Sequence, residues 1–132
     1  IYKGKPIFYS LGDFFLENET MKKVPAGMFE KQGLTGNENM RDMYEDRSDH
    51  GKRGLFYSKV MFETFVPYWE VEDGKLTQIK LLPVELGYGK PHSQGGVPAP
   101  KYDGGILERL AEMSKAYGTE IEIKDGIGYV KL

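Results

Sequence analysis

The clearest alternation of apolar and polar residues lies between Leu55 and Leu86, where two long arms flank the dipeptide Asp73-Gly74. Asp-Gly is a preferred pair for a two-residue type I′ turn, so these arms predict a β-hairpin. The position of the turn sets the register. The predicted cross-strand pairs are Glu72–Lys75, Val71–Leu76, Tyr68–Ile79 and Val66–Leu81. Apolar residues fall on both faces, which predicts that both are at least partly covered, in a sandwich or in a layered α/β arrangement.

A second Asp-Gly pair, Asp125-Gly126, divides the end of the chain into two short arms and predicts a second hairpin. Its expected pairs are Ile121–Val130, Ile123–Gly128 and, on the opposite side, Glu120–Lys131. One face of this hairpin is apolar and the other is polar. We therefore expect it at the edge of a sheet, or packed by one side against a helix.

One amphipathic helix is predicted between the two hairpins, after the Gly/Pro-rich connector Gly87–Tyr102. We expect Asp103 to cap its start and Gly118 to follow its end. The apolar residues at helical spacing are Ile106, Leu110, Met113 and Tyr117.

The first 54 residues give weaker signals. Residues 1–16 indicate a small β unit with a turn at Gly4 and a strand at Ile7–Phe15. Residues 17–54 are rich in charge and hold no period, so we expect a variable, mobile segment with one or two short helical turns. Residues 55–132 form the hairpin–helix–hairpin region. The predicted fold class is α+β: mostly antiparallel β hairpins, sandwich-like, with one C-terminal amphipathic helix.

Composition narrows the functional classes. The 132 residues make one domain's worth of chain, and a start at Ile1 rather than Met suggests a piece of a longer protein. The formal net charge of -2 gives no basic excess, so we expect no nucleic-acid partner. The chain has no Cys, which excludes disulfides, thiolate metal sites and Cys nucleophiles.

Few residues suggest chemistry by themselves. Asp13 lies among apolar residues, where a carboxylate must be hydrogen-bonded, paired or placed at a strand end. Asp46, Asp49 and His50 could bind a metal ion, but their spacing matches no tight ligand motif, so we predict no metal site in this chain. His92, in the Gly/Pro-rich connector, is a candidate ligand-binding residue for a phosphate or a sugar.

Two longer runs resemble a known family. The run "IYKGKPIFYSLGDFFL" resembles the segment that closes the catalytic region of CapA-type proteins, the poly-gamma-glutamate capsule biosynthesis family. The run "GGVPAPKYDGGILERLAEMSKAYGTEIEI" resembles that family's closing pattern of a Gly-x-Pro turn, a helix, Tyr-Gly-Thr and a final strand. Together the two runs cover both ends of the chain.

The resemblance implies a parent protein that looks like the calcineurin-type metallophosphatases, with a β-sandwich and a two-metal site. The family's metal-ligand motifs precede the Gly-Lys-Pro-Ile strand, and none is present here. The chain would then be a C-terminal fragment without cofactors of its own, while the parent would hold divalent metal ions. Ser10 and Asp13 would lie near the site and support the ligands.

The same resemblance implies a bacterial parent that is membrane-anchored or extracytoplasmic. Its partners would be the upstream part of the same chain and an anionic cell-surface polymer. If the strand Ile7–Phe15 pairs with upstream strands in the parent, its open edge would also favour a homo-oligomer through Phe8, Phe14 or Phe15.

Two other interpretations stay open. The chain could be a non-catalytic polymer-binding or protein-interaction module that uses Tyr88, Tyr102 and His92. It could instead be a small hydrolase that uses Asp13, Asp49 and His50. The sequence that precedes Ile1 in the gene would decide between these interpretations, because the family's metal motifs belong there.

Overall fold

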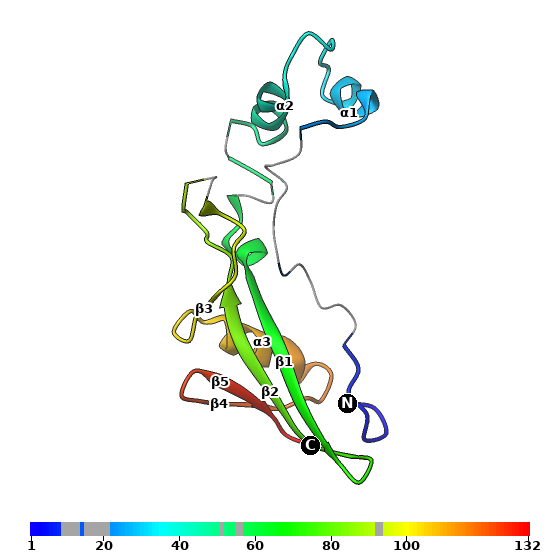
Figure 1. The fold of residues 1–132 in the computed structure, drawn as a ribbon, viewed down its shortest axis with the longest axis vertical. Coiled ribbons are helices and arrows are strands. Elements are labelled where there is room, and N and C mark those ends of the chain that lie inside the picture. Colours follow the sequence, from blue (N-terminus) through cyan, green and yellow to red (C-terminus); the bar gives the residue numbers. More distant parts are fainter. Residues whose placement is uncertain (9–13, 15–21, 51, 55–56, 92–93) are drawn as a thin grey trace.

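The computed structural model describes residues 1–8, 14, 22–50, 52–54, 57–91 and 94–132 (Figure 1). All strands of the described residues join in one antiparallel sheet of order β1-β2-β5-β4, with β3 paired to β2. The elements in chain order are α1 (Ala26–Lys31), α2 (Met40–Arg47), the 3-10 helix η3 (Lys59–Phe62), β1 (Glu63–Glu72), β2 (Lys75–Glu85), β3 (Ala99–Pro100), α3 (Ile106–Lys115), β4 (Ile121–Lys124) and β5 (Ile127–Val130). The predicted α+β class, with antiparallel hairpins and a C-terminal helix, is confirmed.

Both Asp-Gly turns form as predicted. Asp73 and Gly74 have φ values of 49° and 73°, and Asp125 and Gly126 have 49° and 74°. Positive φ at both central residues is the mark of a type I′ turn. The pair next to the first turn, Glu72–Lys75, and the predicted pairs Ile121–Val130 and Ile123–Gly128 of the second hairpin also form.

The register of the first hairpin changes after the second pair from its turn, because β2 carries a bulge. Val71 pairs with Leu76 but Glu70 pairs with Gln78, which leaves Thr77 as an extra residue. The predicted pairs Tyr68–Ile79 and Val66–Leu81 are therefore wrong. The actual partners, each one residue farther along β2, are Lys80 for Tyr68 and Leu82 for Val66.

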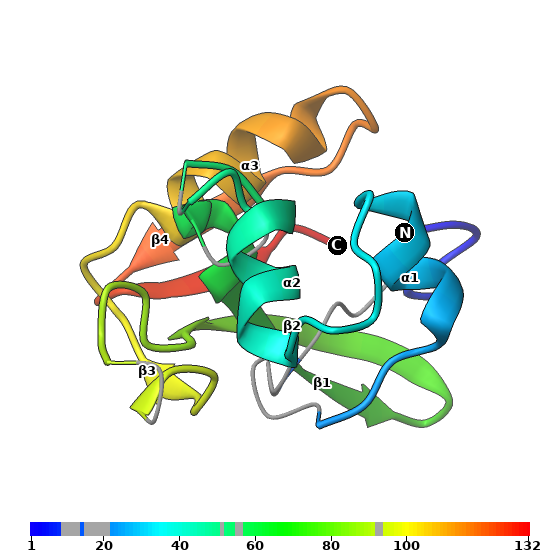
Figure 2. The same ribbon diagram turned by 90° about the horizontal axis from the view of Figure 1, so that it is seen from above.

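The bulge allows Leu76 to pack against the core. In a regular strand Leu76 and Ile79 would point to opposite faces, since side chains alternate. The extra residue brings Leu76 to the side where Ile79 and Leu81 form a buried cluster with Leu107 of α3. Figure 2 shows α3 on this side of the sheet, so the described residues form a sheet layer and a helix layer rather than two packed sheets.

Gly128 allows α3 to lie close to the sheet. A Cβ atom there would be 3.3 Å from both Leu81 and Leu107 side-chain atoms, and 3.2 Å from Ile121. Ile121, Ile123 and Val130 pack against the same buried cluster. The second hairpin thus packs by its apolar side against the helix, as its alternation predicted.

The start of α3 differs from the prediction. The N-cap is Gly105, with φ of 70° and no side-chain cap, rather than Asp103. Asp103 instead pairs with Lys101 at 3.0 Å. The left-handed Gly105 turns the chain into the helix two residues later than a capping Asp would. At the other end Gly118 has φ of 68°, as expected for a residue that terminates a helix.

The N-terminal part lies beside and beyond the sheet. The turn at Gly4 is present, with a Tyr2–Lys5 bridge. Of the predicted strand Ile7–Phe15, only Ile7, Phe8 and Phe14 are described, and these three residues do not form a β-strand. Figure 1 shows α1 and α2, the two short helices of residues 17–54, beyond one end of the sheet.

The second of these helices, α2, has a sequence reason to form. Asn39 accepts hydrogen bonds from the backbone of Arg41 and Asp42, while Asp42 accepts one from the Asn39 backbone. This capping box satisfies backbone donors at the helix start. The side chain of Met43, on this helix, is fully buried. Within the described part of the chain, no helix has the length and hydropathy needed to cross a membrane.

Candidate functional site

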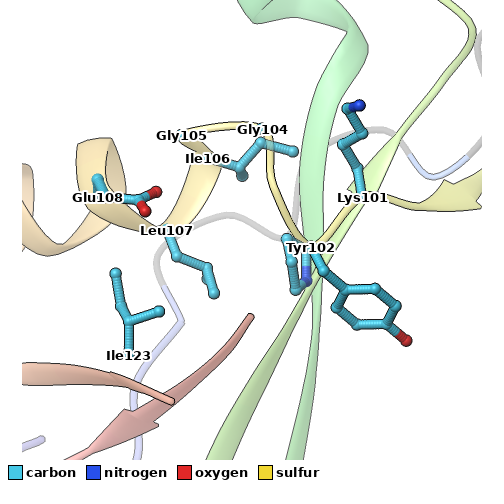
Figure 3. Close-up of a pocket in the computed structure, with 9 residues that line it drawn as sticks. Lys101, Tyr102, Gly104, Gly105, Ile106, Leu107, Glu108 and Ile123 are labelled. Atoms are coloured by element: carbon cyan, nitrogen blue, oxygen red, sulfur yellow. The ribbon is translucent and has the colours of Figure 1, made fainter. Parts of the chain in front are cut away.

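A small pocket lies at the start of α3 (Figure 3). Its volume is about 10 Å³, which is room for about one water molecule. It is lined by Pro83, Lys101, Tyr102, Gly104, Gly105, Ile106, Leu107, Glu108 and Ile123. A pocket of this size holds no substrate. It lies where the connector, the helix α3 and the sheet meet.

Glycines shape this junction. A Cβ atom at Gly104 would lie 2.9 Å from Lys101 Cγ, so a larger residue there would require the Lys101 side chain to move. A Cβ atom at Gly126 would lie 2.5 Å from Tyr102 Cβ and 2.9 Å from its carbonyl oxygen. Tyr102 therefore crosses the β4–β5 turn in direct contact with its backbone. The hydrogen bond that Asp103 accepts from Lys101, together with the positive charge of that ammonium, lowers the pKa of Asp103.

A charged cluster joins α3 to the sheet. Arg109 forms an ion pair with Glu63, whose side chain is only 2% exposed. Lys59 of η3 lies 3.5 Å from the other carboxylate oxygen of Glu63. Two cations hold this carboxylate, and the pair between Arg109 and Glu63 joins α3 to the start of β1. Arg109 lies between Ile106 and Leu110, on the apolar, sheet-facing side of α3. A charged residue at such a position is the sequence signal that indicates this cluster.

Two of the predicted contact tyrosines are exposed but belong to different neighbourhoods. Tyr88 is 42% exposed and packs edge-on against Phe62, with ring centroids 5.6 Å apart. Its backbone N–H donates to Glu85. Tyr102 is 53% exposed and packs on Gly126. The two rings thus lie in separate places, Tyr88 on η3 and Tyr102 on the β4–β5 turn.

The other candidate residues divide in two groups. Ser10, Asp13 and His92 lie outside the described residues. Asp49 and His50 follow α2 in left-handed conformations, with φ of 51° and 50°. His50 Nδ1 is 3.9 Å from Glu45 Oε2, and both side chains are exposed. In the described ranges no three His, Asp or Glu side chains are grouped so that they could hold a metal ion.

Comparison with known proteins gives relatives without an assigned activity. Two proteins of Sinorhizobium fredii (strain NBRC 101917 / NGR234), the uncharacterized proteins y4sH and y4uA, are each 33% identical to this chain over 144 residues. The alignments cover 100% of this chain but 31% of each relative. The chain thus spans about a third of the length of the curated relatives it matches. No family model matches the chain.

Proposed function

We propose that this chain is the C-terminal part of a CapA-type capsule biosynthesis protein, which acts on poly-gamma-glutamate at a bacterial cell surface. The observation that carries the proposal is the run from Gly4 to Phe15, in which Gly-Lys-Pro-Ile is followed by Ser-Leu-Gly-Asp-Phe. The order of helix α3 and a last hairpin agrees with the closing pattern of that family. The greater length of the relatives agrees with a parent that carries further chain.

In this proposal the chemistry belongs to the upstream part of the parent, and the present chain acts as a scaffold. The parent would be a metallophosphatase-like hydrolase with divalent metal ions, membrane-anchored or extracytoplasmic. Asp13 and Ser10 would orient its ligands. The described part of the chain supports a scaffold role, because its buried carboxylate, Glu63, is held by Arg109 and Lys59.

The test uses the complete product of the gene that encodes this sequence. We expect manganese binding by calorimetry, hydrolysis of nitrophenyl phosphate esters, and a change in poly-gamma-glutamate length. Asp13→Asn should lower kcat while metal binding persists, because a supporting residue orients ligands without replacing them. Asp103→Asn, an exposed matched control, should change neither quantity. A complete product with no metal site and no effect on either substrate contradicts the proposal.

A second candidate function is a non-catalytic polymer-binding or protein-interaction module. The observation in its favour is the exposure of Tyr88 and Tyr102 on a fixed scaffold. Binding of poly-gamma-glutamate to the 132-residue chain, followed by Trp69 fluorescence, tests it. Saturable binding that weakens in Tyr88→Ala and Tyr102→Ala would favour this function over the scaffold role.

A second copy of the chain is also proposed as a partner, through the segment Ile7–Phe15. Ile7 is 49% exposed and Phe14 is 48% exposed, while Phe8 packs against Trp69 with ring centroids 5.9 Å apart. Sedimentation velocity over a range of concentrations tests this. We expect a dimer or a larger assembly, and a monomer at every concentration would exclude it.

A further inference from the structure

The face of the sheet that points away from α3 carries a patch of aromatic and aliphatic residues. Ile79 and Leu81 point to the helix, so their neighbours Lys80 and Leu82 point away from it. Cross-strand partners share a face, which adds the residues paired with them. The outer patch consists of Val66, Tyr68, Lys80, Leu82 and Tyr129. Figure 2 shows the helix on the opposite side of the strands.

The outer patch is not patterned as a solvated sheet face. Antiparallel sheets that face water on one side carry polar residues there, in alternation with the core. Here Val66 is 37% exposed and Tyr68 is 50% exposed, beside half-buried Leu82 and Tyr129. The ammonium group of Lys80 lies 5.7 Å from the Tyr68 ring centroid and 6.0 Å from that of Tyr129.

Within the described part of the chain, other residues cover one end of the same face. Towards η3, Phe62, Val84 and Leu86 form a buried cluster, and Tyr88 packs on Phe62. Farther along the strands, among the described residues, this cover ends and Val66 and Tyr68 are exposed. Apolar positions thus continue along this face past the point where cover by other described residues ends.

We propose that the outer patch is the docking surface for the remaining part of the longer parent protein, a proposal that rests on the function proposed above. The relatives that match all of this chain have more than twice its aligned length outside the match, since the match is 31% of each. They therefore carry enough further chain to cover a sheet face. An apolar and aromatic centre with a charged rim, here Glu70 and Glu122, is the usual composition of such an interface.

Charge argues against the other occupants. A symmetric contact between two copies centred on this patch would bring the two Lys80 ammonium groups together, because a two-fold interface sets the same surface against itself. An anionic polymer would meet the carboxylate of Glu70 at the rim, where Glu122 is already paired with Lys124 at 3.1 Å and Lys80 lies over two rings. A protein surface that places an acidic group opposite Lys80 avoids both of these charge repulsions.

Hydroxyl-radical footprinting tests the proposal on the complete gene product and on the 132-residue chain. We expect Tyr68 and Tyr129 to be modified several-fold more slowly in the complete product, because the rings are covered there. Tyr102, an exposed tyrosine beside the β4–β5 turn, should react equally in both.

Paired substitutions give a second measurement. Val66→Glu should lower the Tm of the complete product but leave that of the 132-residue chain nearly unchanged. Val71→Glu, on the same strand and 56% exposed, is the matched control and should affect neither. Equal footprints in the two proteins, or a complete product with no further chain, would overturn the proposal.

The remaining outcomes also decide between occupants. Protection that appears in the 132-residue chain only as its concentration rises assigns the patch to a second copy and overturns the proposal. Protection only on addition of poly-gamma-glutamate overturns it as well. If the complete product protects the patch but binds no manganese, the docking surface stands and the proposed hydrolase-like parent fails.

Discussion

Gly126 offers the sharpest test of the structure, because a matched glycine exists in the first hairpin. Gly126 and Gly74 follow Asp in type I′ turns and have φ values of 74° and 73°. The surroundings differ: a Cβ atom at Gly74 would meet nothing within 4 Å, whereas one at Gly126 would lie 2.5 Å from Tyr102 Cβ. The substitutions Gly126→Ala and Gly74→Ala therefore share the backbone strain and differ in the clash.

The magnitudes follow from these two effects. A left-handed conformation costs an L-residue about 1–2 kcal/mol relative to glycine, so Gly74→Ala should lower the free energy of unfolding by about that amount. Overpacking adds about 1–3 kcal/mol, which brings the expected cost of Gly126→Ala to about 2–5 kcal/mol. Tyr102 cannot simply move away, because the preceding Lys101 N–H donates to the Pro83 carbonyl of β2 at 3.0 Å.

Urea unfolding followed by Trp69 fluorescence measures the difference. With an m-value of about 2 kcal/mol per molar urea, the excess cost of Gly126→Ala should lower its midpoint by about 1 M relative to Gly74→Ala. Equal midpoints for the two variants would refute the contact between Tyr102 and the β4–β5 turn. A lower midpoint for Gly74→Ala would show that the first turn, not the second, is the crowded one.

Three further predictions concern the turn and the ion pairs. Gly74→Val should destabilise the chain more than Gly74→Ala, because a β-branched side chain resists positive φ, and urea midpoints of the two variants would show it. Arg109→Met should lower the free energy of unfolding by about 1–3 kcal/mol. This is less than the cost of breaking a fully buried pair, because the Arg109 side chain is 39% exposed. A urea midpoint equal to that of the unsubstituted chain would contradict the prediction. The hydrogen bond from Lys131, followed by its positive charge, lowers the pKa of Glu120. The pair therefore adds stability at pH values above the pKa of Glu120 in the unfolded chain, and this stability is lost as the pH falls through the pKa of Glu120 in the folded chain. Lys131→Met should raise the titration midpoint of Glu120 measured by NMR. An unchanged midpoint would count against the pair.

Much of the second half of the chain follows from local sequence. Asp73-Gly74 and Asp125-Gly126 specify their turns, because few residues tolerate positive φ at two successive positions. The turn then fixes the register of the nearest pairs, such as Glu72–Lys75 and Lys124–Ile127. The apolar spacing of α3 likewise specifies a helix, since residues three and four apart share one face.

Only the tertiary structure decided the features that join these parts. The bulge at Thr77 arises because Leu76 must reach the cluster beneath α3, a demand that appears only when the helix is in place. The pairing of Lys80 with Tyr129 joins the two hairpins, and Arg109 meets Glu63 across 46 residues of sequence. Turns and helices are determined by neighbours along the chain, whereas register shifts, sheet order and buried ion pairs depend on packing between distant segments.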